Sequence, residues 1–281
     1  MSIDTTTRVG GAPSTPGSGR RAAVSRRMPA LSSRAAKIGL PLAVLVAGLA
    51  GWELSVQSGL VNPITVPAAS DTFAAMAEIM QTSYFWESTW QTLQETLYGF
   101  LIGGLAGLVI GALTGTFALF RTALWPFVVA FQNTPRVALA PVFLTWFGFG
   151  MTSKVVMAAV ICFFPVVINT VAGIASVDDN ARTLFRTYGA TTPQTFFRLT
   201  LPTAAPVAFA GIKTALTLAL LGAIVGEFVG ASEGLGVLVK EFNFQLEVAK
   251  GFAVVIFLAL IGLALYGLIE LAEKRLITWK H

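Results

Sequence analysis

The chain has 281 residues, of which 55% are hydrophobic and 12% charged, about half the charged fraction usual in a soluble domain. Its single cysteine, Cys162, and single histidine, His281, exclude a disulfide framework, a zinc or haem site built from those residues, and a Cys/His or Ser/His/Asp catalytic set. Because the length allows several spanning helices of about 20 residues each, the composition predicts an all-α polytopic membrane protein with no cofactor of its own.

The first segment, residues 1–37, combines Gly, Pro, Ser and Thr with seven basic residues and holds nothing that could form a core. We expect a disordered basic tail on the cytoplasmic side of the membrane. Its charge is interpreted first as a topology signal and second as a binding site for anionic lipid headgroups. The remainder, residues 38–281, is expected to form one transmembrane domain.

Six apolar runs follow the tail, and each is long enough to cross a membrane. They cover residues 38–56, 93–119, 124–149, 155–175, 206–228 and 252–272. The second run carries glycines at steps of four from Gly99 to Gly115, a spacing that lets helices approach closely, and packing within the chain is favoured over a dimer seam. The third run contains Pro126, Pro135 and Pro141, so we expect protein or a water-filled cavity around it.

A long polar interruption, residues 176–203, separates the fourth and fifth runs. Apolar residues in its first half recur at helical spacing. Asp178 or Asp179 can cap the start of this short helix, and Gly189 can adopt the left-handed conformation that ends it. The pattern therefore predicts a helix that stands between two spans.

A second short helix is predicted directly after the first. Thr192 is expected to cap it, with Pro193 at its first position, where a missing N–H costs nothing. This helix carries Phe196 and Phe197, and Pro202 is expected to end it. The two helices together form a hairpin with exposed aromatic side chains.

The distribution of basic residues predicts the orientation. With the N-terminus inside, fourteen Lys and Arg residues lie on the cytoplasmic side and three on the other. This places both termini and the hairpin in the cytoplasm. It also accounts for the net charge of +5 without a nucleic-acid partner.

The hairpin sequence resembles a known motif. After Gly189 and nine further residues the chain reads Leu199-Thr200-Leu201-Pro202. This is similar to the coupling motif of ABC importer permeases, E-A-A-x-x-x-G-x(9)-I-x-L-P, with Leu199 in place of the isoleucine and Thr183-Leu184-Phe185 in place of E-A-A. Further stretches resemble the nitrate, sulfonate and taurine branch of that family: Thr134–Pro141, Trp146–Gly148, Thr152–Lys154, Phe163–Pro165, Gly226–Phe228 and Gly234–Gly236.

The resemblance implies a type I ABC importer permease with six transmembrane helices, acting as a homodimer in the inner membrane. Two cytoplasmic ATPase subunits that bind Mg-ATP and an extracytoplasmic binding protein are the implied partners. No G-x-x-x-x-G-K-[ST] sequence occurs, so the chain is not expected to be an enzyme by itself. The residues implied in ATPase coupling are Asp178, Leu184, Phe185, Gly189, Ala190, Phe196, Phe197, Leu201 and Pro202. The alternative for the hairpin is an amphipathic helix lying on the headgroups.

Four polar residues are candidates for the translocation path: Asn133, Arg136, Asn169 and Glu227. A charge within a span usually faces a cavity, so Arg136 can fix an anion, or it can bond to carbonyls that the prolines leave free. Glu227 can line the outer gate, touch the binding protein, or pair with Lys240 or Lys250. The asparagines can bond the solute or join helices.

The expected cargo is a small polar solute, first an organic sulfonate, taurine or nitrate, and second a pyrimidine-type vitamin precursor or another small heterocycle. A stand-alone secondary transporter is the alternative from another class. It predicts internal repeats and acidic residues within the membrane for ion coupling.

Overall fold

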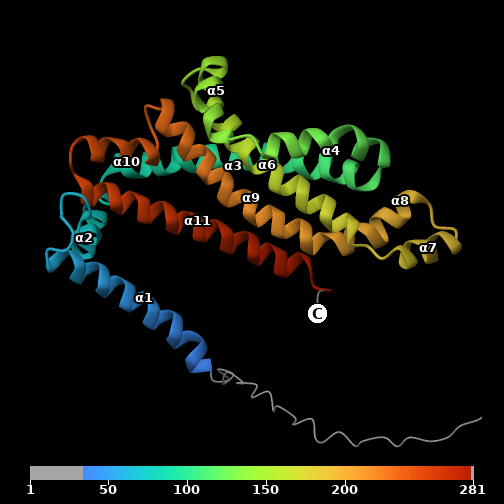
Figure 1. Cartoon of the computed structure of the whole chain (residues 1–281), viewed down its shortest axis with the longest axis horizontal. Coiled ribbons are helices and arrows are strands. Elements are labelled where there is room, and N and C mark those ends of the chain that lie inside the picture. Colours follow the sequence, from blue (N-terminus) through green and yellow to red (C-terminus); the bar gives the residue numbers. More distant parts are fainter. Residues whose placement is uncertain (1–33, 280–281) are drawn as a thin grey trace, which may run out of the picture. The chain divides into compact units, whose positions relative to one another are not determined.

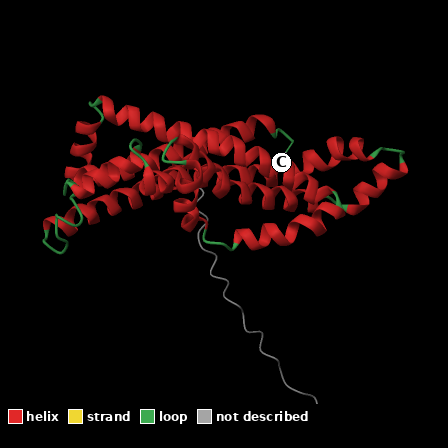
Figure 2. Ribbon diagram, turned by 90° about the horizontal axis from the view of Figure 1, so that it is seen from above, coloured by secondary structure: helices red, strands yellow, loops and turns green. Residues whose placement is uncertain are grey.

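The computed structural model describes residues 34–279, and all regular structure in that range is helical (Figure 2). The chain divides into two compact units, Met1–Gly48 and Leu49–His281. The described part of the first unit is the beginning of α1 (Arg34–Gln57), where the apolar side chains from residue 39 onward are exposed. Residues 1–33 of the predicted tail lie outside the described residues. The helix α1 begins at Arg34, before the predicted first span, which was expected to begin at residue 38.

The second unit contains the remaining helices (Figure 1). They are α2 (Ala69–Ile79), α3 (Ser83–Thr116), α4 (Ala118–Gln132), the 3₁₀-helix η1 (Arg136–Leu139), α5 (Ala140–Phe147), α6 (Met151–Ala175), α7 (Asp179–Thr187), α8 (Thr192–Thr195), the π-turn η2 (Phe196–Thr200), α9 (Leu201–Gly230), α10 (Leu235–Phe244) and α11 (Val248–Leu276).

Five helices in the described range are long and apolar enough to cross a membrane. The predicted third span is instead a bent pair, in which α4 and the η1–α5 segment meet at 89°; counted as one span, it makes six. Pro135 lies at the bend, where its ring favours an extended residue before it. The predicted fold class, an all-α polytopic membrane protein, is confirmed.

The centre of the second unit is formed by α3, α6 and α9, with α6 packed between the other two. A Cβ added to Gly107 would lie 2.8 Å from the Phe163 carbonyl oxygen of α6, and one added to Gly111 would lie 2.7 Å from Thr170. On the other side of α6, a Cβ on Gly222 would lie 2.7 Å from Ala158. The predicted packing of the glycine series within the chain is therefore confirmed.

The second hairpin helix continues into the fifth span. Residues Thr192–Gly230 form one helix of 39 residues, so the prediction that Pro202 ends a helix was wrong. Pro202 lies in the first turn after the π-turn, where the backbone N–H of Leu201 reaches back to Phe196 O. A proline is tolerated at such a position because no donor is required there.

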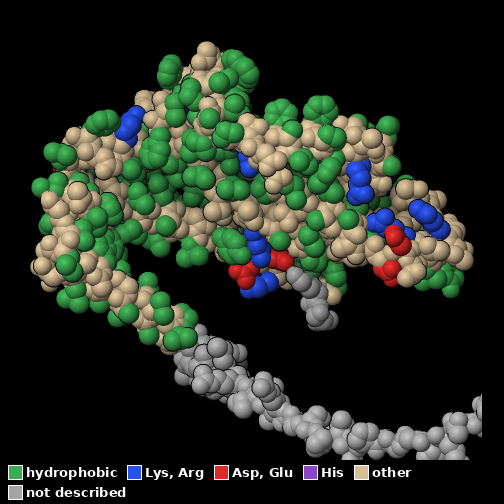
Figure 3. Space-filling view, viewed as in Figure 1, with side chains coloured by type: hydrophobic (Ala, Val, Ile, Leu, Met, Phe, Trp, Pro, Cys, Tyr) green, Lys and Arg blue, Asp and Glu red, His purple; other side chains and the backbone are tan. Residues whose placement is uncertain are grey.

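The two ends of the second unit differ in character. In Figure 1, α7 and α8 project beyond one end of the central helices, and α2 and α10 lie at the other. Apolar side chains cover much of the face drawn in Figure 3, and charged side chains gather near the hairpin and near the end of α11. A core of Ile79, Phe85, Leu235 and Val254 holds α2 and α10 against α3 and α11.

Candidate functional site

The first helix of the hairpin has defined ends. The Asp178 carboxylate accepts a hydrogen bond from the Asn180 backbone N–H at 3.0 Å and caps α7, as predicted. Gly189 has φ +77°, and its N–H donates to Arg186 O while that of Ala190 donates to Phe185 O. This pair of bonds is the Schellman arrangement, in which a left-handed glycine closes a helix.

The second helix begins one residue earlier than predicted. Thr191, not Thr192, is the cap, and its hydroxyl accepts from the N–H of Gln194. The Gln194 amide oxygen accepts from the Thr191 N–H at 2.8 Å, which completes a capping box. The local sequence thus fixes both arms of the hairpin.

A groove of about 450 Å³ lies between the two arms of the hairpin. Four predicted coupling residues line it: Leu184, Phe185, Gly189 and Ala190. Tyr188, the most exposed aromatic residue of the hairpin at 83%, lines the same groove and was not among the predicted site residues. This groove, hereafter the hairpin groove, combines the apolar and aromatic side chains with the polar side chains of Gln194 and Arg198.

Phe196 and Phe197 lie on a different surface. Their rings meet edge to face at 5.3 Å, and both line an apolar hollow of about 370 Å³ that is completed by the last turns of α3. Phe197 is 65% exposed there. The structure therefore separates the predicted coupling residues into two sets that face different surroundings.

Leu201 and Pro202 lie where the hairpin joins α9. Pro206 has no N–H, so the carbonyl of Pro202 lacks its helical donor. The indole N–H of Trp279 donates to this carbonyl at 3.1 Å. Lys213 and Glu273 form an ion pair further along the same two helices. The end of α11 is thus joined to the start of α9.

Arg136 lies at the bend of the third span and lines a cavity of about 510 Å³ between α3, α4, η1, α5 and α6. Its guanidinium lies 5.1 Å from the ring centre of Phe164. Its Nη1 donates to Ile161 O at 3.1 Å. That carbonyl lacks a helical donor because residue 165 is a proline. Arg136 therefore borders a cavity and bonds to a carbonyl that a proline leaves free, whereas its binding of an anion stays a prediction.

The two asparagines do not line this cavity. Asn133 ends α4, is exposed, and donates to Val129 O within its own helix. Asn169 is half-buried, donates to Pro165 O at 2.8 Å, and lies against Gly211 of α9. Their place on a translocation path stays a prediction.

Glu227 is fully buried near the end of the bundle opposite the hairpin. Its carboxylate accepts from the hydroxyl of Thr92 and from the backbone N–H of Gly236, both at 2.6 Å. The predicted pairing with Lys240 or Lys250 was wrong, because α10 folds back and brings its own N-terminus to the carboxylate.

A second buried carboxylate, Glu95, lies in the same region. It accepts from Gln91 at 2.9 Å, and Lys154 lies 3.8 Å from it. Lys154 is 3% exposed, so it lies inside the fourth span and not before it. Neither Glu95 nor Lys154 was predicted as a site residue, because each lies at the edge of an apolar run, where a charged residue usually marks the end of a span.

None of these polar groups builds a metal site in the described chain. Across residues 34–279, no three His, Cys, Asp or Glu side chains lie together in a way that could hold a metal ion.

Comparison with known families identifies the chain. Residues 103–278 match the family described as binding-protein-dependent transport system inner membrane component. This segment contains the bend at Arg136, the hairpin groove and Glu227 with Gly236, whereas Thr92 and Glu95 precede it.

Several curated proteins are similar in sequence. The riboflavin transport system permease protein RibX of Chloroflexus aurantiacus is 35% identical over 86% of this chain and 90% of its own length. The formylaminopyrimidine transport permease protein ThiX of Halalkalibacterium halodurans is 39% identical over 56% of this chain, and the match spans 63% of ThiX. The putative aliphatic sulfonates permease SsuC of Bacillus subtilis is 28% identical over 83% of this chain.

Solved structures share the fold. The MetNI methionine ABC transporter contains a chain with a TM-score of 0.58 and 21% identity, covering 72% of this chain and 97% of that one. A bacterial alginate ABC transporter contains one with a TM-score of 0.55 and 14% identity, covering 86% of this chain and 96% of that one. The chain therefore belongs to the binding-protein-dependent transport system inner membrane components, the permease subunits of ABC importers.

Proposed function

We propose that this permease carries a small heterocyclic solute of the vitamin-precursor type through the cavity beside Arg136. The observation that carries the proposal is the wall of that cavity. Phe131, Phe143, Trp146 and Phe163 line it, and its surface is almost wholly apolar even though Thr134 and Arg136 border it. Flat aromatic surfaces with few polar groups suit a planar ring better than a small hydrated ion. The names of the relatives RibX and ThiX refer to heterocyclic cargo and support the same class.

A small anion of the sulfonate, taurine or nitrate type is the second candidate. A guanidinium carries five N–H donors, and one nitrogen of Arg136 is engaged by Ile161 O, so the group retains donors for an oxyanion. SsuC and the taurine permease TauC of Escherichia coli, 26% identical over 86% of this chain, are named for such cargo.

The proposed machine contains two copies of this chain, two cytoplasmic ATPase subunits that bind Mg-ATP, and an extracytoplasmic binding protein. The hairpin groove is the proposed ATPase contact, because it is exposed, joins the apolar side chains of Leu184 and Tyr188 to the charge of Arg198, and lies between two capped helix ends. Because the chain belongs to a family of permease subunits, this family explains its fold in place of the alternative, a stand-alone secondary transporter.

An uptake assay with a panel of solutes tests the cargo. The permease, reconstituted with its partner ATPase and binding protein, would be supplied with labelled pyrimidine, riboflavin, taurine, alkanesulfonate and nitrate. We expect ATP-dependent uptake of a heterocycle. Uptake confined to taurine or an alkanesulfonate would support the second candidate, and uptake of none of the five would contradict both.

A further inference from the structure

Two arginines of α7 lie one helical turn apart, on the same side of the helix. Within residues 34–279, neither Arg182 nor Arg186 takes part in an ion pair. The nearby Asp178 carboxylate is engaged in capping α7 through the N–H of Asn180. Asp179 lies three residues before Arg182, so this side of α7 carries two guanidinium groups and one carboxylate and has a net positive charge.

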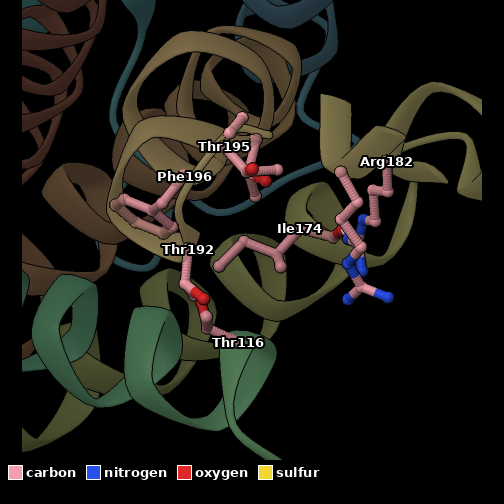
Figure 4. Close-up of a pocket in the computed structure, with 9 residues that line it drawn as sticks. Thr116, Ile174, Arg182, Thr192, Thr195 and Phe196 are labelled. Carbon is pink, nitrogen blue, oxygen red and sulfur yellow. Dashed lines mark hydrogen bonds between the residues drawn. The ribbon is translucent and has the colours of Figure 1, made fainter. Parts of the chain in front are cut away.

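A pocket of about 120 Å³ lies beside these arginines, between the hairpin and the ends of the spans (Figure 4). Thr116 at the end of α3 and Ile174 near the end of α6 form one wall. Thr192 and Thr195 of α8 form the facing wall, and Figure 4 shows Thr116 and Thr192 approaching each other. No acidic side chain lines the pocket.

Two residues that line the pocket carry donors that the described chain does not satisfy. The Nε of Arg182 and the hydroxyl of Thr116 are both buried and have no hydrogen-bond partner there. Arg182 donates through Nη2 to Ile174 O at 2.6 Å, which holds the guanidinium at the pocket wall. A buried donor without an acceptor is unfavourable, so such groups in a native protein usually have a ligand or water.

We infer that this pocket binds a phosphate-type oxyanion, either the headgroup phosphate of an anionic lipid or a free phosphate ion. Two guanidinium groups with threonine hydroxyls are the groups that recognise phosphate oxygens. The pocket also lies where α3 and α6 end, and spans end at headgroup depth, where anionic lipids attract basic residues. The bound anion joins α7 and α8 to α3 and α6.

An acidic side chain from the ATPase is the competing occupant. The position of the pocket disfavours it, because Thr116, Ile174 and Thr200 place the pocket on the side of the hairpin that faces the spans. The groove with Leu184 and Tyr188 is lined by hairpin residues alone and shares only Ala190 with the pocket. The inference concerns the hairpin and does not depend on which solute is carried.

The test compares two arginines of the same hairpin. Arg186 lines the pocket, whereas Arg198 lines the hairpin groove, so Arg198→Gln is the matched control for Arg186→Gln. The full-length protein would be melted in phosphatidylcholine nanodiscs with and without phosphatidylglycerol. We expect phosphatidylglycerol to raise the Tm of the natural protein and of Arg198→Gln by about 2–4 °C, and to leave Arg186→Gln unchanged.

A second arm distinguishes the source of the phosphate. Inorganic phosphate would be added to phosphatidylcholine nanodiscs and compared with chloride at equal ionic strength. A Tm increase here, lost in Arg186→Gln, identifies the free ion; an increase with phosphatidylglycerol alone identifies the lipid. If Arg186→Gln does not fold, Thr116→Val takes its place, because it removes a hydroxyl without changing the charge. We expect Thr116→Val to reduce the same increase in Tm.

Three results would overturn the inference. One is a natural protein whose Tm responds to neither phosphatidylglycerol nor phosphate. Another is an equal loss of the response in Arg186→Gln and Arg198→Gln, which indicates general attraction of the basic hairpin to a charged surface. The third is an Arg186→Gln protein that keeps the lipid response but no longer binds the ATPase, which identifies an ATPase carboxylate as the occupant.

Discussion

Arg136 donates a hydrogen bond to the backbone carbonyl of Ile161, 3.1 Å away, and this is the carbonyl that Pro165 deprives of its donor within α6. A side chain at the bend of the third span thus supplies the hydrogen bond that the backbone of the fourth span lacks. The same side chain lines the cavity assigned to the solute. A structural role and a transport role therefore have to be separated by experiment.

A double substitution separates the two roles. Arg136→Ala leaves Ile161 O without a donor, and we expect it to lower stability by about 1–3 kcal/mol and to reduce uptake. Pro165→Ala restores the helical N–H, so in that background Arg136→Ala should have little effect on stability. Uptake that remains low in the double variant assigns Arg136 to the solute path, and uptake that recovers assigns it to structure. Pro165→Ala alone is the control, and denaturant unfolding with transport assays gives both readings.

The hairpin groove predicts which residues hold the ATPase. Leu184 and Tyr188 are 54% and 83% exposed in this groove, whereas Phe197, 65% exposed, lines with Phe196 the separate hollow beside α3. We expect Leu184→Ala with Tyr188→Ala to reduce ATPase co-purification at least about tenfold, since exposed aromatic anchors often contribute more than 1.4 kcal/mol.

The pair Phe196→Ala and Phe197→Ala is the comparison for that experiment. It is expected to reduce co-purification less than the groove pair, because its main effect is on packing against α3. A larger loss of co-purification with the phenylalanine pair would indicate that the ATPase binds the surface beside α3 and not the hairpin groove. Membrane extraction of both variants at natural levels confirms that each is inserted.

Packing of α3 on α6 predicts a sharp difference between neighbouring glycines. A Cβ on Gly107 would lie 2.8 Å from both Phe163 O and Val166, whereas one on Gly104 meets only the side chain of Phe100 in its own helix, at 3.8 Å. We expect Gly107→Ala to destabilise the protein by about 1–3 kcal/mol and Gly104→Ala to be nearly neutral. Equal effects in thermal unfolding would contradict the close approach of the two helices.

The network around Glu227 predicts a similar contrast between two buried threonines. The hydroxyl of Thr92 donates to Glu227 and accepts from the N–H of Leu235, so it joins three elements. The hydroxyl of Thr96 donates only to Thr92 O in its own helix. We therefore expect Thr92→Val to lower the free energy of unfolding by about 2 kcal/mol more than Thr96→Val. A smaller cost for Thr92→Val would show that α10 is held by its apolar contacts alone.

Orientation is tested with a single cysteine on the hairpin. The native Cys162 is fully buried, so a thiol introduced as Gln194→Cys is the one expected to react with a membrane-impermeant reagent. We expect labelling in inside-out vesicles and protection in intact cells, as the excess of basic residues at this end implies. Labelling in intact cells would show that the hairpin faces the outside of the cell and would contradict the proposed topology.

Much of the fold follows from sequence patterns that depend on neighbouring residues alone. Apolar runs predicted the spans, and the glycines at steps of four predicted the close packing that α3 makes on α6. Asp178 and Gly189 predicted the two ends of α7. These features were predictable because caps, close approach and hydropathy are local properties.

Other features depend on contacts between distant segments. Nothing near Arg136 in the sequence indicates that Pro165 supplies its partner, and nothing near Glu227 indicates Thr92. The predicted stop at Pro202 was wrong because a π-turn before the proline removes the need for its N–H. The division of the coupling residues into two sets also required the position of α3 beside Phe197.

The unbroken helix from Thr192 to Gly230 has a mechanical consequence. Its 39 residues span about 58 Å at about 1.5 Å per residue. A swing of about 10° imposed at the hairpin end would carry the opposite tip through about 10 Å, roughly the width of a helix. In the proposed complex, a movement of a few ångströms in the attached ATPase would be magnified across the bilayer without a change in the backbone torsion angles of this helix.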